Sequence, residues 1–357
     1  MSNLRNWDLF CRIIDNFGDI GVCWRLAKQL HVEHDLQIRL LIDDLDAAQV
    51  IIPNLNFSVN YQVCDEISIT KWDEKTDFSE AAEVVIETFA CGLPPVYLAA
   101  MVRQKSKWIN LEYLSAEPWV ADFHGKPSPQ ANGLTRYFYF PGFTEATGGL
   151  IRERSIAFSN QQDKTNNTLK ISLFCYQHAP IHDLFTALQS NHHVVSVYVP
   201  ASSILPKIAD FFGVGLIKVG DCLSRENLHV QVLPFLSQVD YDDLLRDCDL
   251  NFVRGEDSWV RAIWAGKPFI WQPYFQDENV HIKKLDAFLD LFYVNFEKKE
   301  VVCEAHRYWA AGLTPKDVWQ AYLDNLKAIE TYTYQQAKQQ AKQTDLAAKL
   351  VIFCNKI

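Results

Sequence analysis

Two aspartates stand four residues apart in a short segment that could bind and deprotonate a cationic group. The segment DNFGDIG, residues 15–21, lies between an apolar run at Trp7–Ile14 and a helical pattern at Val22–Leu30. One carboxylate, of Asp15 or Asp19, could act as a general base while the other holds a positive charge. A plainer interpretation is that Asp15 ends a strand and Asp19 caps a helix.

The glycines of this segment set its geometry. Gly18 and Gly21 permit a tight backbone path around Phe17. The segment contains neither the GxGxxG fingerprint of dinucleotide-binding proteins nor a GxxxxGK[ST] phosphate loop. A loop between a strand and a helix is nevertheless where α/β proteins place ligand-binding residues.

A second polar segment follows the apolar run Leu250–Val253. Arg254 offers a fork of donors suited to phosphate. The sequence predicts that Asp257 or Ser258 caps a helix that ends at Gly266, and a helix N-terminus can bind a diphosphate. Glu256 and Asp257 cannot both face phosphate, so one of them is expected at sugar hydroxyls or at another domain. The alternative is a capped helix with solvated charges.

Aromatic and amide side chains follow three further expected strands. Aromatic rings at such strand ends can stack on a nucleobase, and a glutamine amide can recognise the polar edge of the base. Each residue taken alone is equally consistent with core or rim packing. The candidate donor-binding residues of this kind are Phe174, Tyr176, Phe235, Gln238, Gln272 and Tyr274.

Strand and helix patterns alternate along the whole chain, which predicts parallel α/β sheets. The expected strands are Trp7–Ile14, Leu36–Ile42, Glu83–Ile86, Lys107–Leu111, Leu169–Cys175, Val194–Val199, Val230–Leu233, Leu250–Val253 and Pro268–Trp271. The expected helices are Val22–Leu30, His182–Gln189, Asp240–Asp247 and, at the end of the chain, Tyr334–Ile357. In open sheets of this kind, ligands bind beyond the carboxyl ends of the strands.

The segment SNQQDKTNNT, residues 159–168, has no apolar side chain and predicts an exposed linker. We therefore expect an N-terminal Rossmann-like domain at 1–158 and a C-terminal one at 169–341. The helix at about 342–357 could pack back on the first domain. Two α/β domains joined in this way would face each other across a ligand-binding cleft.

Composition excludes several classes of protein. The 357 residues carry 34 Lys+Arg and 44 Asp+Glu, a net charge of −10, which argues against nucleic acid or an anionic membrane as a partner. The sequence contains no apolar run long enough to span a membrane and no signal-peptide pattern. Nine scattered cysteines without a CxxC pair predict buried free thiols in a reducing cytoplasm, and neither they nor the histidines predict a metal site.

Taken together, these features favour a glycosyltransferase that uses a sugar nucleotide without a tightly bound metal or other cofactor. Arg254 and the helix N-terminus would stabilise the diphosphate leaving group. Two alternatives stay open from the residues alone. One is an enzyme with another nucleotide sugar and a small-molecule acceptor, and the other is a non-catalytic module that binds nucleotide sugars.

The two polar segments resemble one known enzyme family. FCRIIDNFGDIGVCWRLAKQL, residues 10–30, and FVRGEDSWVRAIWAGKPFIWQPYFQ, residues 252–276, are similar to the protein-arginine rhamnosyltransferases that modify bacterial translation elongation factor P (EF-P). The aromatic strand-end segments fit this family in the same order. The resemblance implies a GT-B fold, with an acceptor-binding N-terminal domain and a C-terminal domain that binds the nucleotide sugar.

The resemblance also implies a reaction and roles for residues. The donor would be dTDP-β-L-rhamnose, the acceptor a single arginine of EF-P, and the transfer inverting. Asp19 would correspond to the proposed general base, with Asp15 and Glu256 as further catalytic residues. The positions tied to donor binding or catalysis would be Phe174, Tyr176, Phe235, Gln238, Arg254, Glu256, Asp257, Ser258 and Tyr274, with Gln272 beside them.

Overall fold

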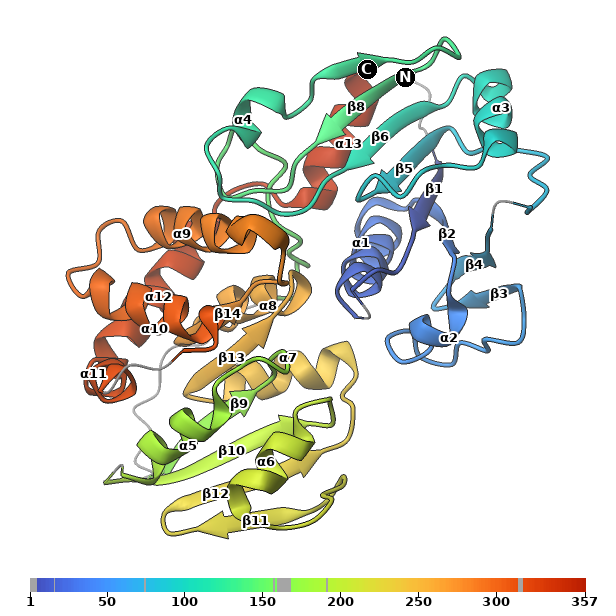
Figure 1. Cartoon of the computed structure of the whole chain (residues 1–357). Helices are drawn as coiled ribbons and strands as arrows, with labels where there is room; N and C mark the ends of the chain where they lie inside the picture. The colour runs from blue at the N-terminus through green and yellow to red at the C-terminus, as the bar shows by residue number, and fades with distance from the viewer. Residues whose placement is uncertain are drawn as a thin grey trace. The chain divides into compact units, whose positions relative to one another are not determined.

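The computed structural model describes residues 5–15, 17–73, 75–156, 158, 168–190, 192–313 and 317–357. These residues divide into two compact units, one formed by 1–156 with 341–357 and the other by 157–340. The linker expected at 159–168 lies outside the described residues except for Thr168, which begins a strand. Each unit is a mixed sheet covered by helices (Figure 1).

The N-terminal unit contains an eight-stranded sheet in the order β3-β4-β2-β1-β5-β6-β8-β7. The strands from β4 to β8 pair in parallel, and β3 and β7 are antiparallel edge strands. The central strands are almost fully buried, which explains their continuous apolar runs. The strands are β1 (Asn6–Cys11), β2 (Gln37–Ile42), β3 (Tyr61–Cys64), β4 (Ile67–Lys71), β5 (Val84–Thr88), β6 (Lys107–Leu111), β7 (Pro127–Pro129) and β8 (Thr135–Tyr139).

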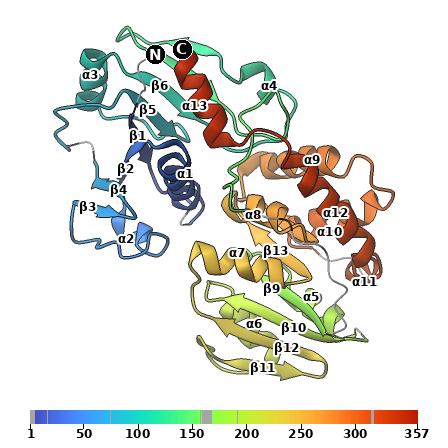
Figure 2. The same ribbon diagram turned by 180° about the vertical axis from the view of Figure 1, so that it is seen from behind.

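One helix of this unit comes from the other end of the chain. The helices are α1 (Gly18–His34), α2 (Leu45–Ala48), α3 (Pro95–Gln104), α4 (Val120–Phe123) and α13 (Leu346–Lys356). Helix α13 lies beside α1 (Figure 2), and its Leu346, Leu350 and Cys354 are buried in the core of this unit. The C-terminal helix thus shares a hydrophobic core with the first strand of the chain.

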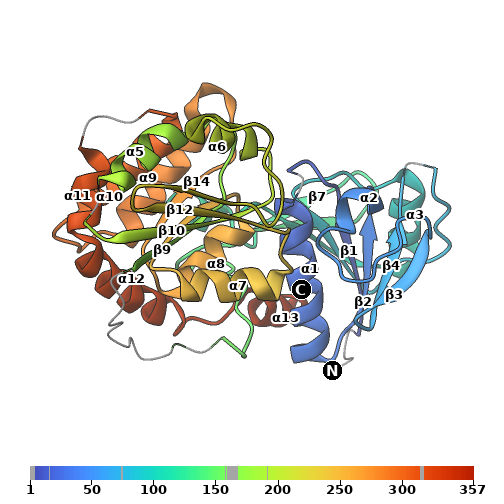
Figure 3. The same cartoon turned by 90° about the horizontal axis from the view of Figure 1, so that it is seen from below.

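The C-terminal unit contains a six-stranded sheet in the order β11-β12-β10-β9-β13-β14, in which only β11 is antiparallel. Helices α5 and α6 lie on one side of this sheet, and α7 and α8 lie on the other (Figure 3). The strands are β9 (Thr168–Leu173), β10 (Val194–Pro200), β11 (Cys222–Arg225), β12 (Leu228–Leu233), β13 (Leu250–Arg254) and β14 (Phe269–Gln272).

The remaining helices complete the C-terminal unit. They are α5 (Ile181–Gln189), α6 (Leu205–Phe212), α7 (Gln238–Asp247), α8 (Asp257–Ala265), the 3-10 turn η1 (Asp277–Asn279), α9 (Val280–Phe292), α10 (Lys299–Ala311), α11 (Val318–Asp324) and α12 (Leu326–Gln340). No helix in the described part of the chain is long and apolar enough to cross a membrane.

Several elements differ from the sequence expectations. The first strand ends at Cys11 rather than at Ile14, and the helix that follows begins at Gly18 rather than at Val22, so Gly18–Gly21 of the expected loop are helical. The single helix expected at Tyr334–Ile357 is instead two helices, because Asp345 caps a new helix start through the N–H of Ala348. All nine cysteines are free thiols, but Cys222 is exposed because it lies on edge strand β11.

The strand orders locate the ligand-binding edge of each sheet. When only the parallel strands are counted, both sheets have the doubly wound strand order. The chain adds strands on one side of the first strand and then reverses, crossing to add the later strands on its other side. Ligands of such sheets bind beyond the carboxyl ends of the strands at this reversal. It lies between β1 and β5 in the N-terminal unit and between β9 and β13 in the C-terminal unit.

Candidate functional site

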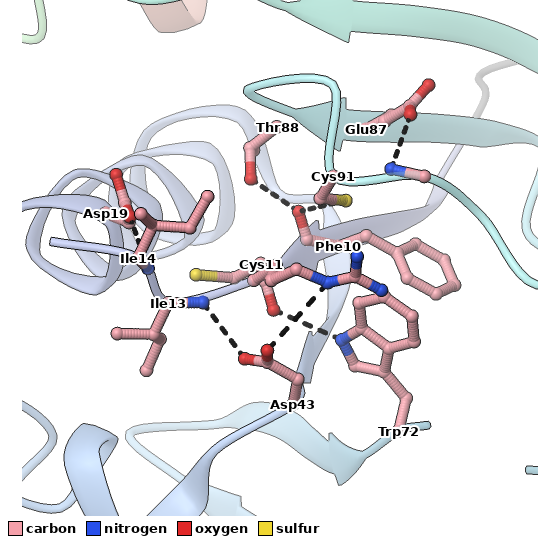
Figure 4. A network of polar contacts seen from close by, with 12 residues as sticks. Phe10, Cys11, Ile13, Ile14, Asp19, Asp43, Trp72, Glu87, Thr88 and Cys91 are labelled. Atoms are coloured by element: carbon pink, nitrogen blue, oxygen red, sulfur yellow. Dashed lines mark hydrogen bonds and ion pairs between the residues drawn. The ribbon is translucent and has the colours of Figure 1, made fainter. Parts of the chain in front are cut away.

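In the N-terminal unit, the segment between β1 and α1 is closed by the carboxylate of Asp19. Its Oδ2 accepts the backbone N–H groups of Ile14, at 2.8 Å, and of Asp15, at 3.0 Å. The side chain points back from the first turn of α1 to the loop (Figure 4) and is 3% exposed. Asp19 therefore orders the loop from within the first turn of α1, whose N-cap is Phe17 and not Asp19 as the capping interpretation expected.

The environment of Asp19 raises the pKa of its carboxyl group. Burial is the main cause, and the negative charge of Asp15 acts in the same direction. Hydrogen bonds from the two loop N–H groups and from Tyr113 lower the pKa and offset part of this effect. A carboxylate with a raised pKa accepts a proton more readily than an ordinary aspartate, which suits a general base.

Asp15 lies half-buried over Gly18. A side chain at Gly18 would place its Cβ 2.8 Å from Oδ2 of Asp15, so the glycine leaves the space that this carboxylate occupies. Gly21 is buried within α1, where its N–H donates to the carbonyl of Phe17. Asn16 lies outside the described residues.

Sequence inspection missed a group that braces this loop from the end of β2. Oδ1 of Asp43 accepts the N–H of Ile13 at 3.0 Å, and its Oδ2 lies 4.0 Å from Nε of Arg12. The guanidinium of Arg12 in turn lies over the ring of Trp72, with 5.1 Å from its carbon to the ring centroid. Burial raises the pKa of Asp43. Its place directly after a strand adjacent to β1 is the signal that could have identified it.

Two aromatic residues, one beside Asp19 and the other stacked on the first, were also missed. Tyr113 follows β6, and its hydroxyl lies 3.5 Å from Oδ1 of Asp19. Its ring stacks on Phe89, which follows β5, with 4.2 Å between ring centroids and 8° between planes. Both follow strands on the same edge of the sheet as the Asp15–Asp19 loop, and that position could have revealed them.

In the C-terminal unit, Arg254 at the end of β13 lies against two aromatic rings. Its guanidinium carbon is 4.4 Å from the ring centroid of Phe174 and 4.6 Å from that of Tyr176, the two aromatic residues that follow β9. Nη1 also donates to the carbonyl of Cys175, at 3.5 Å. These contacts fix the guanidinium at the strand ends where a ligand is expected.

Gln272 supports Tyr176 from within the protein. Its fully buried amide accepts the N–H of Tyr176 at 2.7 Å and donates to Nε2 of His178 at 2.9 Å. Burial lowers the pKa of His178, which favours the neutral ring that accepts this bond. Tyr274 packs edge-on against Tyr176 at 5.9 Å and is 48% exposed.

The start of α8 differs from the expected capped helix. Glu256, rather than Asp257 or Ser258, occupies the N-cap, and its side chain makes no capping hydrogen bond. The hydroxyl of Ser258 instead donates to the carbonyl of Arg254, one turn back, because it faces the strand end. Gln238, at the start of α7, lies 3.4 Å from Asp257 through Nε2 and Oδ2, and Phe235 is half-buried after β12.

The structure thus gathers the predicted residues into two groups, one in each unit. Asp15 and Phe17 precede α1, and Gly18 and Asp19 lie in its first turn. In the C-terminal unit, Phe174, Tyr176 and Ser258 contact Arg254, and Tyr274 contacts Tyr176. In the described residues, no group of three or more His, Cys, Asp or Glu side chains lies close enough to hold a metal ion.

Comparison with known proteins places the chain among enzymes. A family model described as elongation factor P rhamnosyltransferase EarP matches residues 7–355. The chain belongs to the EarP family. It is 40% identical over 368 residues to the protein-arginine rhamnosyltransferase of Pseudomonas putida, covering 97% of this chain and 98% of the relative. It is 35% identical to that of Shewanella oneidensis, with 99% of both chains covered.

Solved structures agree with this membership. A structure described as the basis for EarP-mediated arginine glycosylation of EF-P matches with a TM-score of 0.68 and 30% identity, covering 98% of this chain and 99% of that one. MurG of Acinetobacter baumannii, at 13% identity and a TM-score of 0.55 with 99% of both chains covered, shares the fold alone. The expected GT-B fold is confirmed, and rhamnosylation of an EF-P arginine is the activity of this EarP family member.

Proposed function

We propose that the chain transfers L-rhamnose from dTDP-β-L-rhamnose to one arginine of EF-P, with inversion at C1 and with Asp19 as the general base. The observation that carries this assignment is the buried Asp19 carboxylate, held by the N–H groups of Ile14 and Asp15 at the strand end where ligands of this fold bind. EF-P is the acceptor of the EarP family.

The reaction requires a base because the acceptor is a guanidinium with a pKa above about 12, which is a poor nucleophile while protonated. A guanidinium nitrogen forms a bond to C1 of rhamnose as the bond from C1 to the diphosphate oxygen breaks. Asp19 accepts the N–H proton, and the electron pair of the breaking bond leaves with dTDP. The raised pKa of Asp19 matches this role.

We assign orienting roles to two further carboxylates. Asp15, over Gly18, holds part of the positive charge of the acceptor arginine and aligns it. Glu256, at the N-cap of α8 without a capping hydrogen bond, is a helper from the C-terminal unit. Phe17, at the N-cap of α1, and Gly18 and Gly21, in its first turns, set the geometry with which the acceptor loop enters the helix.

We assign donor binding to the strand ends of the C-terminal unit. Arg254, held between Phe174 and Tyr176, and the first turn of α8 with Asp257 and Ser258 stabilise the diphosphate without a tightly bound metal. Phe235, Gln238 and Tyr274 contact the nucleoside, and Gln272 supports Tyr176. The free thiols of the chain fit a site of action in the cytoplasm.

The base assignment is tested with Asp19→Asn, incubated with EF-P and dTDP-β-L-rhamnose. The amide cannot accept the proton, so transfer should fall by about 10²–10⁴-fold while dTDP binding is nearly unchanged. Mass spectrometry of EF-P measures the transfer. Asp35→Asn, at the exposed C-terminal end of α1 where φ is 55°, is the matched control and should behave as wild type. Transfer by Asp19→Asn at a near wild-type rate would refute the assignment.

The diphosphate assignment is tested with Arg254→Ala by calorimetry with dTDP. Loss of a charge-assisted contact should weaken binding about tenfold to a hundredfold. Arg246→Ala, which removes an exposed arginine on α7 paired with Asp243, is the control. Unchanged affinity for dTDP in Arg254→Ala would contradict the role.

The stereochemical assignment is tested on the product. Inversion of a β-linked donor gives α-linked rhamnose on the arginine, which the coupling at C1 in an NMR spectrum distinguishes from the β anomer. A β-linked product would exclude an inverting transfer.

A further inference from the structure

Asp19 presents its two oxygens to different parts of the N-terminal unit. Oδ2 accepts the two loop N–H groups at 2.8 and 3.0 Å, whereas Oδ1 faces the hydroxyl of Tyr113 at 3.5 Å. The proton from the acceptor must reach a carboxylate oxygen, and Oδ2 already carries two donors. Oδ1 is therefore the oxygen that acts as base, and Tyr113 is the side chain beside it.

We infer that Tyr113 is a positioning residue for the rhamnosyl transfer, which orients Oδ1 of Asp19 toward the acceptor arginine, and that Phe89 holds Tyr113 in place. The inference rests on the proposed role of Asp19 as base. A hydrogen bond of 3.5 Å is long, but catalytic hydrogen bonds are often long without substrate and shorten when it binds. The phenol hydroxyl donates its single proton to Oδ1 of Asp19.

The backbone of the Phe89 segment is built to hold this ring. Phe89 and Ala90 both have left-handed φ angles, of 55° and 51°, which are uncommon for residues other than glycine. The N–H of Phe89 donates to the carbonyl of Leu111 at 2.7 Å, and that of Ala90 to Oδ1 of Asn110 at 3.1 Å. The strained segment after β5 is thus fixed to β6, directly before Tyr113.

Packing joins this segment to the base. The Phe89 ring is parallel to that of Tyr113, with 4.2 Å between centroids, so it restricts the rotation of the phenol. Glu112 is tied to the same strand through the side-chain amide of Asn110. The result is a continuous chain of contacts from two adjacent strands to a single oxygen of Asp19.

The pH dependence of transfer reports on this contact. The titratable groups around Asp19 are Asp15 on its own loop, Cys11 at the end of β1, and Tyr113 from the loop after β6. The pKa of Cys11 is raised well above its usual value, so this thiol stays neutral over the working range. The Tyr113 hydrogen bond favours the ionised carboxylate and lowers the pKa of Asp19, so its removal should raise that pKa.

The experiment compares the pH profile of kcat for wild type and Tyr113→Phe, which keeps the ring stack and removes only the hydroxyl. We expect the acidic limb of the profile to move to higher pH and kcat at neutral pH to fall about tenfold. Affinity for dTDP and the melting temperature should stay as in wild type. Tyr137→Phe, on β8 with its ring against Phe353, is the matched control and should leave the profile unchanged.

A second variant tests the role of the stack. Phe89→Leu keeps the Tyr113 hydroxyl and removes its ring partner, so the acidic limb should move in the same direction by a smaller amount. If Tyr113→Phe fails to fold, the pH profile of Phe89→Leu alone tests the inference. An acidic limb that stays at the wild-type pH in the folded variants overturns the inference, even if kcat falls. Transfer by Asp19→Asn at the wild-type rate would instead refute the proposed base itself, so the two failures are distinguishable.

Discussion

The side chains of the two sites are fixed before any substrate binds. Asp19 is held by the loop that it closes, and Arg254 is held between Phe174 and Tyr176. Electrostatic stabilisation by groups that need not reorganise is an effective source of catalysis. At the scale of single residues, the structure therefore supports a rigid loop for the acceptor arginine and a fixed cation for the diphosphate.

Gly18→Ala tests whether the position of the Asp15 carboxylate matters. The added methyl group would lie 2.8 Å from Oδ2 of Asp15, and the flexible carboxylate must move away. Alanine is the better helix former, so the free energy of unfolding should be unchanged or rise by up to about 1 kcal/mol. Transfer to EF-P should nevertheless fall about tenfold to a hundredfold because the charge is misplaced.

Gly215→Ala is the control for this prediction, because a Cβ at Gly215 meets no atom within 4 Å. Urea unfolding measures stability, and mass spectrometry of EF-P measures transfer. A Gly18→Ala enzyme with the wild-type rate would show that the Asp15 carboxylate has no fixed role.

At the scale of elements, the strand ends were predicted more accurately than the helix ends. Lys107–Leu111 coincides with β6, and Leu250–Val253 differs from β13 by one residue. The predicted start of α8 was wrong: the hydroxyl of Ser258 donates to the carbonyl of Arg254 instead of capping the helix N–H groups. Which hydrogen bond Ser258 makes depends on where the carbonyl at the end of β13 lies, and the local sequence does not show this.

The C-terminal helix shows how a distant segment divides a continuous helical pattern. Between α12 and α13, the amide of Gln343 donates to the carbonyl of Phe143, and Asp345 both caps α13 and accepts Nε2 of Gln29 on α1. These contacts replace helical hydrogen bonds at the break, so tertiary structure overrides local propensity there.

Leu350→Ala should destabilise the N-terminal unit because it removes a buried anchor of α13. Leu350 is fully buried in the same core as β1 and α1, so truncation should lower the free energy of unfolding by about 2–5 kcal/mol. Ile352→Ala, at an exposed position of the same helix, should have little effect. Urea unfolding checks both, and equal destabilisation would contradict the packing of α13 on this core.

At the scale of the whole molecule, the two units repeat one topology with different chemistry. Each has its reversal of strand order beside the first strand, and each carries its candidate site at the carboxyl ends of those strands. Carboxylates follow β1 of the N-terminal unit, which suits an arginine, and Arg254 ends β13 of the C-terminal unit, which suits a diphosphate. Asp15 and Asp19 are thus two of the acidic residues behind the net charge of −10, placed where they could bind the acceptor arginine.

The pH dependence of stability should reflect a buried histidine of the C-terminal unit. Burial lowers the pKa of His306 to about 4, from about 6.5 in the unfolded chain. Its neutral form is favoured in the fold, so the stability is fully present above pH 6.5 and is lost as pH falls toward 4, by up to about 3 kcal/mol. Asp19 and Asp43, whose pKa values are raised, act with the opposite sign.

His306→Leu should therefore flatten the fall in melting temperature between pH 6.5 and pH 4. His192→Leu, at an exposed position of the same unit, is the control. Thermal unfolding followed by circular dichroism measures the effect. An equally steep fall in both variants would show that His306 does not contribute.

The sequence by itself determined the alternating elements, the two sheets and most of the chemistry. Strand ends carry ligand residues in this fold, so Asp15, Asp19 and Arg254 could be selected from their positions along the chain. The similarity of whole segments supplied the family, which single residues could not, because the same residue types occur in capped helices and cores.

Only the tertiary structure decided which side chains act on these residues. Tyr113 reaches Asp19 and stacks on Phe89 because β5 and β6 lie side by side in the sheet, although more than 20 residues separate Phe89 from Tyr113 in the chain. Gln272 supports Tyr176 across nearly a hundred residues in the same way. Contacts between segments so distant depend on strand order and on burial, and neither is encoded in any local pattern.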